Sequence, residues 1–376
     1  MEYKLKFMIM KSKKISIVIL TFAALVFMGQ GCITVGFGAK KVQDGGMYSS
    51  EDKGEIWKQK VFAGIVKKKT QTISNANISK ILFHPLDSKI IYLGTTNSGM
   101  LVSSDSGESW KSILVSSGSV QAIGLDPTSA QILYVGLGGQ IQKSTDAGAA
   151  WTVIYTQAVS GYSITAVAVD PFNPRQIFAG ASNGVILKSD DSGASWKAMP
   201  GQAAKAEIRD IIFHPNDPSL MIAVTPSNGI FKSFDRGITW GEFISKETAA
   251  KFTGSLTAGV LLPHARVSSM FLYASAYGLM RTSDGGKTWE AVNLLTKPGE
   301  VKILSLAANP YDFDEVYYGT ASNLYKTFNN GNEWITRSLP SSRQPTALGI
   351  NPNDTGKIWM GTTKPVQKKK SLLSPL

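Results

Sequence analysis

Short apolar runs recur along the chain, and each closes on a turn that contains proline. Six of these turns share one form, an apolar or small residue followed by His, Asp or Asn and then Pro: Phe83-His84-Pro85, Leu125-Asp126-Pro127, Val169-Asp170-Pro171, Phe213-His214-Pro215, Ala308-Asn309-Pro310 and Ile350-Asn351-Pro352. A divergent version, Pro263-His264, stands between the fourth and the last two. A second short apolar stretch follows each turn, as in Tyr92-Leu93-Gly94. Stretches of this length between turn residues predict β-strands.

A second motif lies between these pairs of strands. Seven of the eight tryptophans end the same pattern, Ser/Thr-x-Asp/Asn-x-Gly-x-x-Trp, and Trp359 lies outside it. Its acidic or amide position and its tryptophan are Asp52 and Trp57, Asp105 and Trp110, Asp146 and Trp151, Asp191 and Trp196, Asp235 and Trp240, Asp284 and Trp289, and Asn329 and Trp334. Successive tryptophans stand 41 to 53 residues apart. A period of about 40–50 residues is typical of a four-stranded propeller blade.

The two ends of the repeat region complement each other. The N-terminal end begins with a third strand and its motif, from Gly46 to Ser50, whereas the C-terminal end stops after a first and second strand, at Thr362. We therefore predict an all-β, seven-bladed propeller over residues 46–363, closed by pairing of the N- and C-terminal strands, because closure removes free sheet edges. Residues 364–376 form a basic tail with three consecutive lysines, 368–370.

The tryptophan-terminated motif resembles the Asp-box, or BNR repeat. That motif occurs in sialidases, sortilin-type receptors, xyloglucanases and photosystem II stability-factor-like propellers. The resemblance implies a structural role for the motif residues. It agrees with their chemistry, because Asp and Asn bond backbone N–H groups in tight turns and Gly adopts positive φ. A tryptophan packed between blades also needs a partner for its indole N–H.

The first 32 residues have the layout of an export signal. Five lysines precede an apolar run from Ile15 to Met28, which is too short to span a membrane and is followed by Gly29-Gln30-Gly31-Cys32. The segment resembles a bacterial lipoprotein signal, which implies removal of residues 1–31, lipidation of Cys32 and a linker over residues 32–45. The protein is then exported and anchored in the cell envelope. The alternative is a plain secretory signal and a soluble secreted or periplasmic protein.

Composition narrows the functional classes. The formal net charge is +12, but lysines dominate and there are seven arginines, so the diffuse charge argues against nucleic-acid recognition. One cysteine excludes an intramolecular disulfide and a cysteine-based metal site. The histidines His84, His214 and His264 stand at turn positions that are elsewhere Asp or Asn. We expect them to cap their own turns, and we expect no metal and no cofactor.

Two longer connections and one set of strand charges are candidate partner-binding sites. The connection after Trp57 contains Lys67, Lys68 and Lys69, and the one after Trp240 contains Lys246 and Lys251. Loops of a rigid scaffold commonly carry binding residues, although these two are also consistent with loops that are merely longer. On the first strands, Lys80, Arg209 and Asp210 replace mostly small or polar residues. The first strand lines the central channel of a propeller, so these charges mark a binding site or a solvated channel wall.

Two functions fit these features. The repeat region looks like the photosystem II stability/assembly-factor-like propellers, which implies a non-enzymatic binding or assembly scaffold whose partner is an envelope or membrane protein. The alternative is a glycoside hydrolase of sialidase or xyloglucanase type, with a polysaccharide as ligand. The Arg-Ile-Pro signature of sialidases is absent. Xyloglucanase-like enzymes use two propellers with a carboxylate pair between them, and this chain has room for one. The residues therefore favour a binding protein over an enzyme.

Overall fold

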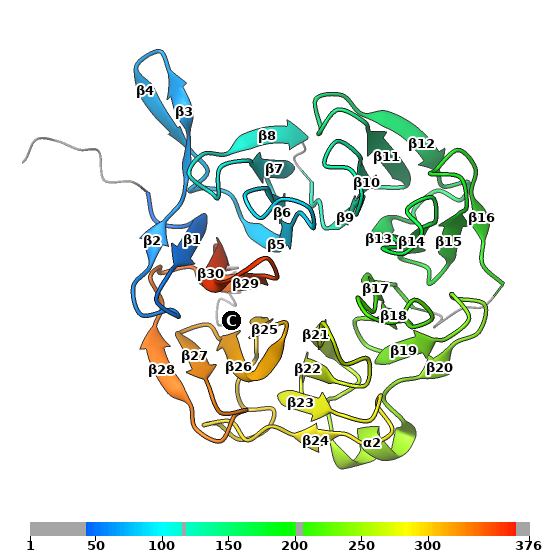
Figure 1. Ribbon diagram of the computed structural model, residues 1–376, viewed down its shortest axis with the longest axis vertical. Coiled ribbons are helices and arrows are strands. Elements are labelled where there is room, and N and C mark those ends of the chain that lie inside the picture. Colours follow the sequence, from blue (N-terminus) through cyan, green and yellow to red (C-terminus); the bar gives the residue numbers. More distant parts are fainter. Residues whose placement is uncertain (1–42, 115–117, 201–205, 366–376) are drawn as a thin grey trace, which may run out of the picture. The chain divides into compact units, whose positions relative to one another are not determined.

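The computed structural model describes residues 43–114, 118–200 and 206–365. Seven four-stranded antiparallel sheets stand around a central axis like the blades of a propeller (Figure 1). This arrangement confirms the predicted all-β, seven-bladed fold. The expected signal peptide, Cys32, the linker up to residue 42 and the basic tail from residue 366 lie outside the described residues.

Each blade runs from an inner first strand to an outer fourth strand. In chain order, blades 1 to 3 are β5 (Ile78–Phe83), β6 (Ile91–Thr95), β7 (Met100–Ser103) and β8 (Lys111–Leu114); β9 (Ala122–Leu125), β10 (Leu133–Leu137), β11 (Gln140–Ser144) and β12 (Thr152–Thr156); and β13 (Ile164–Val169), β14 (Ile177–Ala181), β15 (Ile186–Ser189) and β16 (Lys197–Ala198).

Blades 4 to 6 follow the same order. They are β17 (Asp210–Phe213), β18 (Met221–Val224), β19 (Ile230–Ser233) and β20 (Gly241–Glu242); β21 (Ala258–Pro263), β22 (Phe271–Ser275), β23 (Leu279–Thr282) and β24 (Glu290–Ala291); and β25 (Ser305–Asn309), β26 (Asp312–Gly319), β27 (Asn323–Thr327) and β28 (Ile335–Ser338). The second strands are buried on both faces because neighbouring blades pack against them, which explains why they read as continuous apolar stretches.

Blade 7 is built from both ends of the chain. It consists of β29 (Gln344–Asn351), β30 (Asp354–Thr363), β1 (Met47–Ser50) and β2 (Lys58–Gln59), with β1 between β30 and β2. Tyr48 pairs with Met360 and Ser49 with Trp359 in an antiparallel register. The predicted closure is confirmed.

Ionic contacts join blade 7 to blade 6. The Glu55 carboxylate accepts hydrogen bonds from the Lys326 ammonium at 2.6 Å and from the Arg337 guanidinium at 2.7 Å. These two cations hold the pKa of Glu55 down at about 2. Lys326 is buried, and its ammonium also donates to the Lys53 carbonyl at 2.8 Å. The N-terminal half-blade is therefore tied to its neighbour as well as to β30.

Every Asp-box turn has the same hydrogen bonds. In blade 1, the Ser103 hydroxyl donates to Asp105 Oδ1 at 2.7 Å and accepts the Gly107 N–H at 2.7 Å, and the Ser109 N–H donates to Asp105 Oδ1 at 2.8 Å. The turn needs positive φ at Ser106 and at Gly107. The other six turns repeat these contacts around Asp52, Asp146, Asp191, Asp235, Asp284 and Asn329.

The Asp-box tryptophans connect neighbouring blades to different extents. Trp110 and Trp289 are buried, whereas Trp57, Trp151, Trp196, Trp240 and Trp334 are only partly buried. Four of the seven donate their indole N–H to a carbonyl of the preceding blade or its outer connection, namely Trp110 to Lys60, Trp151 to Ile113, Trp289 to Phe243 and Trp334 to Asn293. Trp196 and Trp240 donate instead to their own turns, at Gly193 and Gly237. An indole bond to the preceding blade does not by itself bury the ring, because Trp151 and Trp334 make this bond and are only partly buried.

A basic residue just before the Asp-box forms a further bridge between blades. Lys143 donates to the Ser192 carbonyl at 2.9 Å, and Lys232 donates to the Gly285 carbonyl at 2.8 Å. Both carbonyls belong to the residue after the box aspartate of the next blade. Lys326 makes the same contact with Lys53, so the bridge also crosses the closure.

None of the described helices combines the length and the apolar character needed to cross a membrane.

Candidate functional site

The central channel brings together the three charges expected there. Lys80 on β5 and Asp210 on β17 come from blades 1 and 4, yet their Nζ and Oδ1 atoms are 3.3 Å apart. Both side chains are partly exposed, at 25% and 37%. They line a cavity of about 320 Å³ together with Arg209 and inner-strand residues of other blades. An ion pair therefore spans the channel.

Arg209 fixes the channel wall beside this pair. Its guanidinium donates to the Ala258 carbonyl at 2.7 Å and to the Gly259 carbonyl, both on β21 of the neighbouring blade. The pairing of β21 with β22 is irregular between Ala258 and Val260, so the Gly259 carbonyl lies outside the regular ladder. Among the described residues that line this cavity, Lys80 and Arg209 are cations and Asp210 is the one carboxylate. The channel site carries a net positive charge.

The predicted lysine loop after Trp57 is an ordered hairpin. Strands β3 (Phe62–Val66) and β4 (Lys69–Thr72) pair only with each other and project from the outer rim of the ring (Figure 1). Lys67 and Lys68 form its two-residue turn with φ of 48° and 62°. Positive φ at both central residues is the geometry of a type I′ hairpin turn.

The second lysine connection contains a short helix, α2 (Lys246–Lys251). Ser245 caps it by accepting the Thr248 N–H, and the Lys251 ammonium lies 4.9 Å from the centroid of the buried Phe252 ring. Lys246 and Lys251 are exposed. Figure 1 places α2 and the β3–β4 hairpin at separate parts of the outer rim, so the two lysine connections stay separate candidate sites. The two connections belong to different blades, and the ring separates them.

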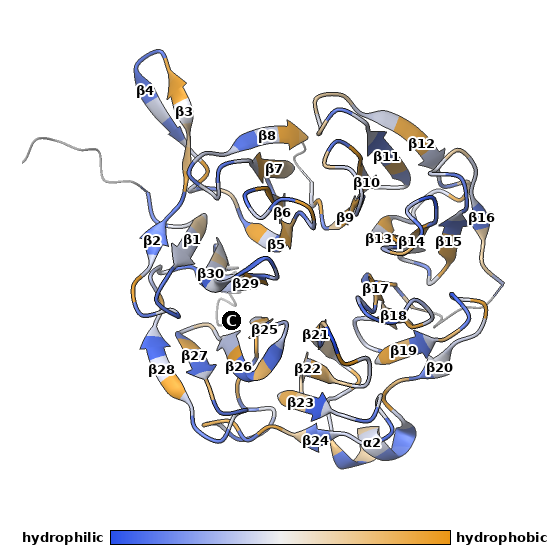
Figure 2. Ribbon diagram, viewed as in Figure 1, coloured by the Kyte–Doolittle hydropathy of each residue, from blue (hydrophilic) through white to orange (hydrophobic). Residues whose placement is uncertain are grey.

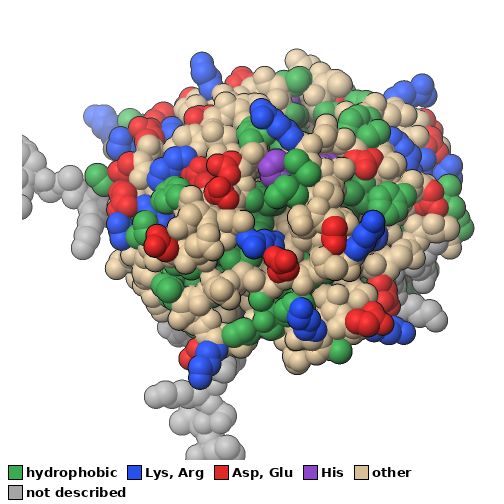
Figure 3. Space-filling view, turned by 60° about the horizontal axis from the view of Figure 1, so that its bottom comes forward, with side chains coloured by type: hydrophobic (Ala, Val, Ile, Leu, Met, Phe, Trp, Pro, Cys, Tyr) green, Lys and Arg blue, Asp and Glu red, His purple; other side chains and the backbone are tan. Residues whose placement is uncertain are grey.

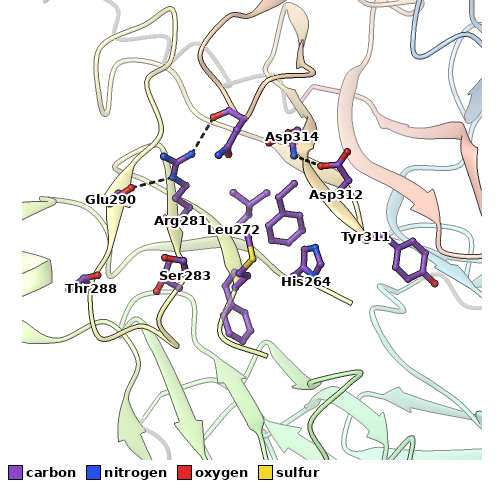
Figure 4. Close-up of a pocket in the computed structure, with 14 residues that line it drawn as sticks. His264, Leu272, Arg281, Ser283, Thr288, Glu290, Tyr311, Asp312 and Asp314 are labelled. Carbon is purple, nitrogen blue, oxygen red and sulfur yellow. Dashed lines mark hydrogen bonds and ion pairs between the residues drawn. The ribbon is translucent and has the colours of Figure 1, made fainter. Parts of the chain in front are cut away.

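A second cavity, which the sequence did not reveal, lies between blades 5 and 6 (Figure 4). It has a volume of about 370 Å³. His264 packs edge-on against Phe313 at its floor, with ring centroids 5.0 Å apart. Arg281 faces Glu290 at 3.4 Å, and the Asp312 carboxylate accepts the Asp314 N–H at 3.0 Å. In the sequence, the feature that could have pointed to this cavity is the group of acidic residues that follows the Asn309-Pro310 turn.

The charges around this part of the molecule are mixed. On the face shown in Figure 3, acidic and basic side chains are interspersed and separated by neutral surface. The histidines cap their own turns, as expected: His84 Nδ1 accepts the Leu86 N–H at 3.1 Å, His214 Nδ1 accepts the Asn216 N–H at 3.1 Å, and His264 Nδ1 accepts the Arg266 N–H at 3.2 Å. Burial lowers the pKa of His84 and of His214. The described residues contain no group of three or more His, Cys, Asp or Glu arranged to hold a metal ion.

Comparisons with known proteins agree with this architecture. The family model described as Sortilin-Vps10, sortilin and neurotensin receptor 3, matches residues 139–275. The chain is a seven-bladed β-propeller whose blades carry Asp-box turns. No curated protein matches it.

Several solved structures share the fold. The Niastella koreensis GH74 enzyme has a TM-score of 0.60 and 17% identity, over 81% of this chain and 53% of that one. The GH74 xyloglucanase from Xanthomonas campestris has a TM-score of 0.56 and 17% identity, over 82% and 52%. YCF48 bound to a D1 peptide has a TM-score of 0.57 and 15% identity, over 78% and 94%. The matched part of this propeller thus corresponds to about half of each GH74 enzyme but to nearly all of YCF48.

Proposed function

We propose that this protein is a non-enzymatic binding and assembly scaffold of the cell envelope, and that it holds an extended segment of an envelope or membrane protein at the central channel. The Lys80–Asp210 pair beside Arg209 carries the proposal. A partly exposed ion pair costs little to open, because such pairs contribute about 0–1 kcal/mol in water. An acidic partner segment replaces Asp210 as the ligand of Lys80 and compensates the net positive charge.

The fold comparison supports the same class of function. YCF48, which this chain resembles over nearly the whole length of YCF48, is described in complex with a D1 peptide. Peptide binding is a property of that protein and is proposed here for this one. The export signal and lipidation of Cys32 belong to the same proposal, and they would keep the scaffold beside a membrane-bound partner.

A glycoside hydrolase is the alternative, supported by the GH74 enzymes among the similar structures. Glycoside hydrolysis commonly uses two carboxyl groups that flank the bond, about 5–10 Å apart. In the described lining of the channel cavity Asp210 is the one carboxylate, and it is paired with Lys80. The channel residues therefore favour binding.

Site-specific photocrosslinking tests the proposal. A photoreactive residue is placed at Gln121, which lines the channel cavity, and as a control at Thr152, which is exposed on the outer strand β12. We expect irradiation of intact cells to join position 121, and not position 152, to one defined segment of an envelope protein. Lys80→Glu should weaken this crosslink. Equal adducts at both positions would reject the channel as the binding site, and release of oligosaccharides from a β-glucan or a sialoside by the purified protein would replace the scaffold with the hydrolase.

A further inference from the structure

The β3–β4 hairpin is firmly held at its base. The Ile73 N–H donates to the Val61 carbonyl at 2.8 Å, and both side chains are buried in the core between blades 7 and 1. The Trp110 N–H donates to the Phe62 carbonyl at 2.9 Å. A free two-stranded hairpin is at best marginally stable in water, so these contacts explain why residues 62–72 stay extended away from the ring.

The tip of the hairpin is apolar on both faces. Ile65 pairs directly with Thr70 and Val66 with Lys69, so Ile65 and Val66 point to opposite sides. Their exposed fractions are 69% and 56%, and Phe62 is exposed at 41%. Figure 2 shows the apolar character concentrated on β3 and the polar character on β4. In the described chain, no further strand pairs with β3 or β4.

The same tip carries a concentrated positive charge. Lys67, Lys68 and Lys69 are exposed, and among the ion pairs of the described residues none involves them. No acidic residue occurs between Glu55 and Asp87 in the sequence. Outside the Asp-box turns, Lys67 and Lys68 are the described non-glycine residues with positive φ. The backbone thus holds the lysines at the outermost point despite a conformation that side chains disfavour.

We propose that this hairpin contacts the surface of an anionic lipid bilayer, with Ile65 and Val66 in the headgroup region and Lys67–Lys69 bound to lipid phosphates. Apolar residues beside clustered lysines are the composition of segments that bind at a membrane interface. A bilayer surrounds an inserted tip and therefore buries both Ile65 and Val66, which point to opposite sides.

The chain enters the propeller beside the base of the hairpin, which is consistent with a hairpin tip that faces the membrane. The Gln43 carbonyl accepts a hydrogen bond from the Gln59 side chain at 3.0 Å, and Gly46 lies against Val61 and Ile73 at the hairpin base. The inference rests on the lipid anchor in the proposed function. Ten residues lie between Cys32 and Gln43, and these eleven residue steps span at most about 40 Å. The five residue steps from Val61 to Val66 extend only about 17 Å. A lipidated Cys32 therefore leaves the tip within reach of the same bilayer.

A fluorescent probe on the tip tests the contact directly. Cys32 is the one cysteine, so Val66→Cys in a Cys32→Ser background gives the full chain a single labelling site that carries no lipid. An environment-sensitive dye at this site is compared with the same dye at Ala150→Cys, an exposed position in the Asp-box of blade 2. The vesicles contain phosphatidylcholine with phosphatidylglycerol, or phosphatidylcholine alone.

We expect a blue shift at position 66 with the anionic vesicles, reversed by salt and absent at position 150. Lys67→Gln, Lys68→Gln and Lys69→Gln together should raise the lipid concentration needed by about a hundredfold, because each lysine near an anionic surface contributes about a factor of five. Ile65→Ser keeps the turn and the charge, and should reduce the shift at unchanged circular dichroism.

Other outcomes would overturn the inference. Vesicle binding with no shift at position 66 would mean that the hairpin stays in water, and an equal response to both lipids would remove the role of the lysines. A shift without lipid that grows with protein concentration would identify a second copy of this chain as the partner. Loss of channel crosslinking together with the lysine substitutions would identify a protein partner instead. Intact crosslinking at position 121 in the first three cases would leave the scaffold proposal standing.

Discussion

The Glu55 carboxylate and the Lys326 ammonium, 271 positions apart in the chain, are 2.6 Å apart at the junction where the ring closes. The Lys326 side chain is only 2% exposed, so its ammonium relies on this partner and on the Lys53 carbonyl for hydrogen bonds. Glu55→Gln should lower the free energy of unfolding by about 1–3 kcal/mol, the cost of leaving a buried polar group poorly paired. Chemical denaturation measures the change.

Arg337→Gln is the matched control for this prediction, because it removes the exposed partner of the same carboxylate. It should have a smaller effect than Glu55→Gln. Equal losses in the two variants would show that burial of Lys326 does not determine the contribution of the closure contact.

The Asp-box carboxylates should make stability depend on pH in the acid range. Hydrogen bonds from the hydroxyl and N–H groups of Ser195, Thr239 and Thr288 lower the pKa of Asp191, Asp235 and Asp284 to about 2. A pKa lower in the folded state than in the unfolded state stabilises the protein at pH values above the unfolded value near 4. That stability is lost as the pH falls toward 2. Denaturant midpoints at pH 6, 4 and 2.5 should record the fall.

An asparagine variant separates this effect from other acid-sensitive groups. Asn329 makes the same turn contacts as the aspartates, since its Oδ1 accepts the Thr327 hydroxyl and the Glu333 N–H at 2.9 Å each. Asp191→Asn, Asp235→Asn and Asp284→Asn together should therefore fold and should show a shallower dependence between pH 4 and 2.5. An unchanged slope would exclude these carboxylates as its source.

The difference in burial predicts that equivalent Asp-box tryptophans contribute unequally to the free energy of unfolding. Trp110 is 1% exposed, whereas Trp151 is partly exposed. Trp110→Ala should cost about 3–5 kcal/mol, as truncation of a core aromatic does, and Trp151→Ala should cost less. Thermal and denaturant unfolding would measure both. Equal losses would mean that the shared motif, and not the neighbouring blade, determines the contribution of the tryptophan.

Reversal of one charge in the Lys80–Asp210 pair should lower the stability of the protein. Lys80→Glu places a second carboxylate beside Asp210 and should lower stability by about 1 kcal/mol or less, because the pair is partly exposed. Adding Asp210→Lys restores opposite charges and should recover most of the loss. A double variant no more stable than Lys80→Glu would show that the two side chains do not interact in solution.

Removal of the expected lipid site should change the location of the protein. Cys32→Ala should leave the chain unprocessed or release it from the membrane fraction, which fractionation and intact-mass measurement detect. Membrane association and a mature mass shift that both match the parent protein would contradict lipidation at Cys32.

The repeated parts of the molecule were accessible from sequence, and the unique parts were not. The Asp-box motif and the complementary ends predicted the blades and their closure, because each motif fixes its own turn locally. His84 was assigned to a turn because aspartates or asparagines stand at the same position in other blades. The hairpin was missed because Lys67 and Lys68 are unusual residues for a turn with positive φ.

Contacts between blades were also hidden. Lys80 and Asp210 were expected in the channel, but their pairing follows from the ring geometry across 130 positions. The cavity at His264 depends on how blades 5 and 6 sit together, which no single repeat encodes. The burial of Trp110 depends on residues 60–62 of the preceding connection, which lie outside the repeated pattern.

The position of β1 between β30 and β2 sets an order of events during synthesis. Tyr48 is made early, but its partner Met360 is among the last residues of the propeller to appear. Until β30 arrives, blades 1 to 6 can form only an open arc, and the N-terminal half-blade has exposed backbone groups along one side. Pairing over such a sequence separation is slow. The last two strands, β29 and β30, therefore ensure that only a fully synthesised propeller closes, because a chain that ends before them cannot form the ring.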